Sequence, residues 1–281
     1  MKGGFLLLLS FLILAPCLKP ISACAQVDPW EFEVYPYATE NRGVVELETL
    51  NAVVADGFSE PDKGTGGPRF ASQSSWYNGN EFTYGFTDRI EAAVYADFSL
   101  ISGHGIQWSG SKYRLRGRLF DPGVLPVDIG WYVELEYNAV PQFDDTSLEL
   151  ELRPIVEKDI GLFSFCFNPK FEKPLTGPEH NNGWNFGYAT GAYYRFQRYF
   201  SPGIEFFGAI GDMANSDSLS QQHHYVFPVV WGNLPHGIEY SLGPGFGLTE
   251  GSDRILVKFN IGLERFLGAI FGPSSDSAWF F

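Results

Sequence analysis

The chain alternates apolar and charged side chains with a period of two, in segments of about ten residues separated by turn-forming residues. The segment 128–138 is the clearest example, because one parity is apolar throughout and the other holds Glu134 and Glu136. Successive side chains of a β-strand point to opposite faces of a sheet, so each such segment is predicted to be a two-faced strand. Almost no helical periodicity interrupts this pattern between residues 43 and 268.

Twelve segments of this kind are predicted, and the linkers between them alternate in length. The longer linkers follow the odd-numbered segments and the tight ones follow the even-numbered segments, as in outer-membrane barrels with short periplasmic turns and longer outer loops. The predicted strands are 43–55, 76–87, 89–100, 111–120, 128–139, 146–156, 162–173, 184–196, 203–212, 223–232, 237–247 and 254–267.

The predicted fold class is therefore all-β, an antiparallel transmembrane β-barrel of about 12 strands. The composition agrees with it, since aromatic residues reach 17% and charged residues only 19%. The bilayer core offers no hydrogen-bond partner to a backbone N–H or C=O at the edge of a sheet. A lipid-facing sheet must therefore close on itself. A soluble periplasmic all-β binding protein stays open as an alternative, with its charged parity facing water.

The first 26 residues have the features of an export signal. Lys2 supplies the positive start, residues 5–14 are apolar apart from Ser10, and Ala23-Cys24-Ala25 is a small-residue cleavage motif. Lipidation at Cys24 is the alternative, because residues 21–24 also resemble a bacterial lipoprotein box. The predicted organisation is a signal peptide over 1–26, an N-terminal periplasmic lead over 27–42, a barrel over 43–268 and a polar tail over 269–281 that ends in aromatics.

The charge of the chain limits its partners. With 19 basic and 33 acidic residues the formal net charge is −14, which argues against nucleic acid. The expected partners are outer-membrane lipid, the barrel-assembly machinery and a small-molecule solute. Cleavage after residue 25 leaves Cys166 as the single thiol, so no intrachain disulfide is expected in the exported chain.

Four basic residues on one predicted strand lie beside two acidic strands. Neighbouring strands are ~4.8 Å apart, so these bases and acids can pair across the sheet. Two interpretations stay open, a charged wall that filters solutes and an ion-pair ladder that fills the interior. The inward parity carries more acids than bases, so an open pore is predicted to prefer cations. The candidate pore-lining residues are Lys112, Arg114, Arg116, Arg118, Glu134, Glu136, Glu149, Glu151 and Arg153.

An enzyme is not expected. None of the five histidines has a serine two residues on, and the chain has no G-x-S-x-G nucleophile elbow. Ligands that would converge on a metal are not evident either, so neither a metal nor another cofactor is predicted.

Three stretches resemble a family of poorly characterised outer-membrane β-barrels of Gram-negative bacteria. They begin at Tyr35 (YPYATENRGVVELE), Gly110 (GSKYRLRGR) and Leu148 (LELELRP). The family is similar to barrels described as transporters of a phenol-degradation pathway, the MetA pathway. The resemblance implies an integral outer-membrane channel or transporter for passive passage of small solutes, with hydrophobic or aromatic compounds as a candidate class. A closed barrel with a structural or surface-binding role is the alternative.

Overall fold

The computed structural model describes residues 26–60, 70–143 and 146–263, and these form twelve strands and no helix. The predicted signal peptide, the lipidation alternative at Cys24 and the tail over 269–281 lie outside the described residues. The strands are β1 (Val45–Asp56), β2 (Trp76–Thr87), β3 (Ile90–Ile101), β4 (Gly105–Arg118), β5 (Asp128–Asn138), β6 (Leu148–Ile160), β7 (Phe163–Pro174), β8 (Asn185–Tyr194), β9 (Ser201–Asp212), β10 (His223–Leu234), β11 (Ile238–Gly247) and β12 (Ile255–Leu263).

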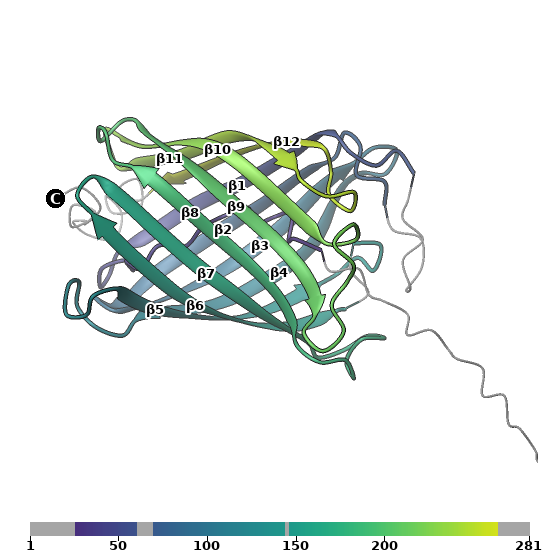
Figure 1. Ribbon diagram of the computed structural model, residues 1–281, viewed down its shortest axis with the longest axis horizontal. Coiled ribbons are helices and arrows are strands. Elements are labelled where there is room, and N and C mark those ends of the chain that lie inside the picture. The colour runs from purple at the N-terminus through teal and green to yellow at the C-terminus, as the bar shows by residue number, and fades with distance from the viewer. Residues whose placement is uncertain (1–25, 61–69, 144–145, 264–281) are drawn as a thin grey trace, which may run out of the picture.

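Each strand pairs antiparallel with its neighbour in sequence, and β1 pairs with β12 to close the barrel (Figure 1). The predicted fold class is therefore confirmed, including the strand number. In the described part of the chain, no helix is long and apolar enough to cross a membrane.

The two faces of the wall differ as the alternation predicts. Apolar side chains on the outer parity are exposed and form the surface that lipid would contact in a membrane. Charged side chains on the other parity point inward and are mostly buried. Outward residues more than one third exposed include Val94, Tyr113, Leu115, Phe165, Phe167, Ile204, Phe246, Val257, Phe259 and Ile261.

Strand β4 starts six residues before its predicted beginning, at Gly105 rather than at 111. The pairs Asp97–Gly110 and Phe98–Trp108 leave Ser109 as an extra residue, which is a β-bulge. The bulge moves the outward parity from even to odd numbers, and this change hid the first half of the strand from a period-two search. The connection β3–β4 is consequently only residues 102–104, an exception to the long odd-numbered linkers.

Two turns also lie away from their predicted places. Strand β6 extends to Ile160 through most of the gap between the predicted strands 146–156 and 162–173. The β6–β7 turn is Gly161-Leu162, and Gly161 has a φ of 60° that suits glycine. Strand β9 begins at Ser201, two residues before the predicted start at 203, and the connection from β8 spans 195–200. Proline at position 202 is tolerated near the start of that strand.

Candidate functional site

The residues that precede β1 occupy the interior of the barrel. Residues 26–44, called here the plug segment, form a chain without regular secondary structure that runs inside the wall and reaches the rim at the exposed Arg42 and Gly43 (Figure 1). Trp30, Phe32, Tyr35 and Tyr37 are each at most 6% exposed. The expectation of a periplasmic lead over 27–42 is corrected on this point, because these side chains pack and pair inside the barrel instead of preceding it.

A buried carboxylate ties the plug segment to two strands. Glu31 Oε2 lies 3.1 Å from Lys112 Nζ of β4, and its Oε1 accepts a 2.8 Å hydrogen bond from Arg153 Nη2 of β6. All three side chains are 1% exposed. Lys112 also binds Asp28 of the plug segment. Removal of one partner from an ion pair buried this deeply strongly destabilises a protein, because the other charge is left buried without a counter-charge.

The ring of Tyr35 lies between three guanidinium groups of the wall. The centroid is 5.0 Å from the Cζ atoms of both Arg114 and Arg116 and 4.9 Å from that of Arg153. Its hydroxyl lies 3.0 Å from the hydroxyl of Tyr95. A cation and the face of an aromatic ring attract each other. These contacts therefore hold the middle of the plug segment against β4 and β6.

Side chains of the wall also satisfy the plug segment's backbone. The amide of Tyr35 donates to Asn168 Oδ1 of β7, and the amide of Tyr37 donates to Glu157 Oε2 of β6, both at 2.7 Å. An irregular backbone at this depth needs such partners, since it has no ladder of its own.

Aromatic side chains attach the plug segment to β9 and β10 as well. The ring of Phe32 packs at centroid distances of 5.3, 5.4 and 5.0 Å on Phe207, Tyr225 and Phe227. The carbonyl of Phe32 accepts a 3.0 Å hydrogen bond from Lys258 Nζ of β12. The plug segment is thus attached around the barrel and not along one side.

The basic residues predicted to line a pore point into the barrel. Lys112, Arg114 and Arg116 are buried, and Arg118 is half-buried. Arg114 Nη2 and Arg116 Nε lie 2.9 and 2.7 Å from the same oxygen of Glu91. Pairing between bases and acids is predicted with the two acidic strands that follow β4. Arg114 and Arg116 instead pair with Glu91 of β3, the strand that precedes it.

The predicted acidic strands contribute Glu134, Glu136, Glu149, Glu151 and Arg153. Glu134 and Glu136 lie 3.8 and 3.7 Å from Lys112 Nζ. Arg153 Nε donates a 2.5 Å bond to Glu151. Glu149 is half-buried at the register position opposite Glu136. The structure brings these residues together around the plug segment, and their role in lining a pore stays a prediction.

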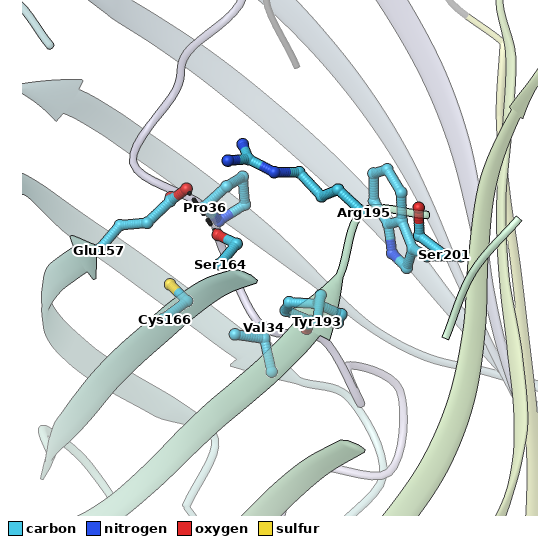
Figure 2. A pocket seen from close by; sticks show the side chains of 9 residues that line it. Val34, Pro36, Glu157, Ser164, Cys166, Tyr193, Arg195 and Ser201 are labelled. Atoms are coloured by element: carbon cyan, nitrogen blue, oxygen red, sulfur yellow. Dashed lines mark hydrogen bonds between the residues drawn. The ribbon is translucent and has the colours of Figure 1, made fainter. Parts of the chain in front are cut away.

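An apolar pocket lies between the plug segment and the wall near the short turns. Figure 2 shows Val34 and Pro36 of the plug segment beside Cys166 and Tyr193 of β7 and β8. Trp231 of β10 also lines it. Glu157, Ser164, Arg195 and Ser201 also line it, but most of the surface that faces the pocket is apolar, so it suits an apolar molecule with a few polar atoms.

A second, outward-facing groove lies behind the same part of the wall. Phe165, Phe167 and Ile204 line it from the outer parity, and Cys166 and Glu157 line both the groove and the inner pocket. The β6–β7 strand pairing is interrupted next to it.

The interruption coincides with two prolines. Pairing is present at Leu152–Phe171 and again at Val156–Phe167 in one register, with no paired residues between them. That register sets Pro154 opposite Pro169, and proline has no N–H to donate to a ladder. The interruption therefore adjoins the groove at Val156 and Phe167, whereas Glu157 and Cys166, which line both cavities, are paired.

The plug segment is the part of the site that the sequence analysis missed. Its signal was present, since residues 30–34 read Trp-Glu-Phe-Glu-Val directly before the first strand. A segment that alternates large apolar residues with carboxylates needs apolar and basic partners on different sides, and a barrel interior provides both. The stretch was too short to stand out as a strand.

Comparisons with known proteins give a likeness in structure only. No protein-family model matches the chain, and no curated protein sequence matches it either. A crystal structure of an outer membrane channel from Pseudomonas putida F1 has a TM-score of 0.53 at 12% identity, over 85% of this chain and 99% of that chain. LpxR from Salmonella typhimurium has a TM-score of 0.42 at 9% identity, over 78% and 99% of the two chains. The likeness to the channel concerns the fold, and the fold of this chain is that of an outer-membrane β-barrel.

Proposed function

We propose that this chain is an outer-membrane channel protein, not an enzyme, that passes small apolar or aromatic solutes. Its closed barrel, its apolar outer surface and its likeness in fold to an outer membrane channel support this placement.

The plug segment argues against a wide aqueous pore. Its side chains fill the space between β4, β6 and β10, and its charges are paired with those of the wall. A twelve-strand barrel is intermediate between filled small barrels and open porins of about sixteen strands, so one enclosed segment strongly narrows it. Ion conductance through the lumen should therefore be small, and cation-selective because acids outnumber bases there.

One observation carries the choice of an apolar solute: an inner apolar pocket and an outer apolar groove lie on the two sides of the wall, next to an interruption of its strand pairing. The pocket beside Cys166 and the groove beside Phe167 lie on the two sides of the paired residues Glu157 and Cys166, and the unpaired stretch at Pro154 and Pro169 adjoins them along the wall. Lateral passage through that stretch needs no wide lumen, and it favours solutes that are stable in lipid.

A reversible cross-link across the interruption tests the route. Residues 154 and 169 face each other, and directly opposite positions in antiparallel strands have Cα atoms about 4.5–5.5 Å apart, within reach of a disulfide. The double variant P154C/P169C is made in a Cys166→Ser background. Uptake of the apolar dye N-phenylnaphthylamine into cells expressing it should fall on oxidation and recover on reduction.

The matched control places the same cross-link where the ladder is continuous. Val133 and Leu152 are opposite each other on β5 and β6, so V133C/L152C oxidises without closing the interruption. Its uptake should not depend on redox state. Equal uptake by oxidised and reduced P154C/P169C would refute the lateral route.

A closed barrel with a structural role is the second candidate, favoured by the buried ion pairs of the lumen. It predicts that cells with and without the protein take up the dye equally, and that the refolded barrel has no conductance.

A further inference from the structure

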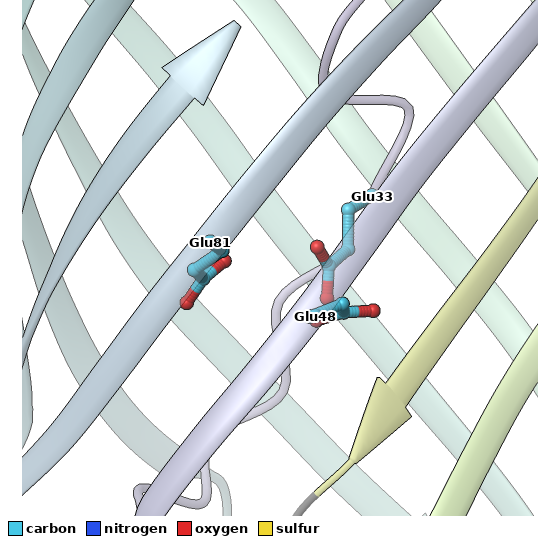
Figure 3. A group of neighbouring side chains, drawn as sticks. All are labelled: Glu33, Glu48 and Glu81. Atoms are coloured by element: carbon cyan, nitrogen blue, oxygen red, sulfur yellow. The ribbon is translucent and has the colours of Figure 1, made fainter.

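We propose that three carboxylates inside the barrel form a binding site for a calcium ion that joins the plug segment to β1 and β2. The site consists of Glu33 of the plug segment, Glu48 of β1 and Glu81 of β2 (Figure 3). It is a proposal about metal binding and does not depend on which solute, if any, crosses the barrel.

The geometry of the three groups fits one ion. Each offers a carboxylate oxygen, and these oxygens all lie within 4.8 Å of one another. Ligands on opposite sides of Ca²⁺ are about 4.8 Å apart at a Ca–O distance of about 2.4 Å, whereas Mg²⁺ draws them to about 4.2 Å. Oxygens no more than 4.8 Å apart are close enough to share one Ca²⁺, and carboxylates are ligands it prefers, whereas Mg²⁺ usually keeps several of its waters.

The charge around the site calls for a cation. Seven glutamates and only three basic side chains line the cavity that contains it. The bases are already engaged, Arg114 and Arg116 with Glu91 and Lys258 with Glu205. In the part of the chain that the structure describes, neither Glu33 nor Glu48 has an ion pair with a basic residue. Carboxylates this close repel each other unless a cation or a shared proton lies between them.

Unsatisfied polar atoms at the same cavity point independently to a ligand. Ser241 of β11 lines this cavity, is 5% exposed, and its Oγ has no hydrogen-bond partner among the described residues. Oε2 of Glu33 and Oε2 of Glu81 are likewise buried without a partner there. Buried polar atoms usually have a partner. An ion would supply one to the two carboxylate oxygens, and the water that accompanies it in the cavity is available to Ser241.

One carboxylate oxygen of Glu81 is available to coordinate a metal ion. Its Oε1 lies 2.5 Å from Arg114 Nη2, which leaves Oε2 for the metal. A bound ion would thus continue the network that holds Tyr35 and would fix the plug segment at Glu33. The site exists only when the plug segment is in place, because one of its three carboxylates belongs to that segment.

Isothermal titration calorimetry of the full chain, refolded in detergent and treated with chelator, tests the proposal. Ca²⁺ should bind at one ion per chain, more tightly than Mg²⁺. Glu33→Gln and Glu48→Gln should each weaken the binding at least about tenfold, since affinity follows the number of charged ligands. Glu250→Gln, which alters an exposed loop glutamate, should leave it unchanged.

Heat-modified gel migration verifies that each variant is folded, so a misfolded variant is not counted as a loss of binding. Glu33 lies outside the strands, and its neutral isostere keeps the barrel's own ladder intact. No binding up to about 10 mM Ca²⁺, beyond the range of weak extracellular sites, would overturn the proposal. So would tighter binding of Mg²⁺, or unchanged Ca²⁺ affinity in folded Glu33→Gln and Glu48→Gln.

Discussion

Replacing Glu31 by glutamine should release the plug segment while leaving the barrel closed. The carboxylate makes two charge-assisted contacts, at 3.1 Å to Lys112 and 2.8 Å to Arg153. Each such bond has a net contribution of about 1.5–3 kcal/mol. Lys112 keeps Asp28 and Arg153 keeps Glu151, so the lower limit applies, and the free energy of docking should fall by about 3 kcal/mol.

A loss of that size raises the population of the undocked plug segment roughly a hundredfold, because about 1.4 kcal/mol is tenfold. Hydrogen exchange can measure it at the amides of Tyr35 and Tyr37, whose bonds go to wall side chains and break on undocking. Protection there should fall by about that factor in detergent-solubilised Glu31→Gln, with amides of the strand ladders unaffected. Single-channel recordings should show larger or more frequent cation-selective openings.

Asp121→Asn is the matched control. Asp121 pairs with Arg89 at 2.5 Å, but both side chains are at least half exposed, and such pairs contribute about 0–1 kcal/mol. It should leave both the exchange and the conductance unchanged. Unaltered exchange at Tyr35 and Tyr37 in folded Glu31→Gln would refute the view that buried ion pairs hold the plug segment.

Two further predictions concern the plug segment's contacts. Phe32→Ala removes a 4% exposed ring from its aromatic cluster and should lower the free energy of docking or unfolding by about 3–5 kcal/mol, measured by denaturant titration, whereas Phe58→Ala at a 44% exposed position should change it little. Cys166, whose thiol donates to the carbonyl of Tyr35, should resist maleimide in the native barrel and react in Glu31→Gln; equal labelling of both would contradict its burial under the plug segment.

The strands could be predicted because one face of a barrel wall contacts lipid and the other does not. That difference imposes a period of two on every spanning segment, and eleven of the twelve strands begin within three residues of their predicted positions. The exception, β4, contains the bulge at Ser109, and a bulge reverses the parity without any strong compositional signal.

The interior could not be predicted to the same extent. The sequence identified Lys112 and Glu134 as inward-facing, because this depends only on parity. Which carboxylate each base binds depends on segments far apart in the chain, as with Glu31 and Arg153, and no local pattern encodes that contact. The cluster of Glu33, Glu48 and Glu81 was missed for the same reason, since it joins three separate elements.

Enclosure of the plug segment also constrains how the molecule is assembled. The plug segment is continuous with β1, and β1 is joined to β12 by the last pairing that closes the wall. A closed wall does not admit a chain of this length from the side, so the plug segment must enter the open sheet before this seam forms or pass later through one end. Its contact with Lys258 of β12 becomes available only with the final strand. When the plug segment enters first, the enclosed charges lose their water in two stages, first against β4 and β6 and then as the seam closes.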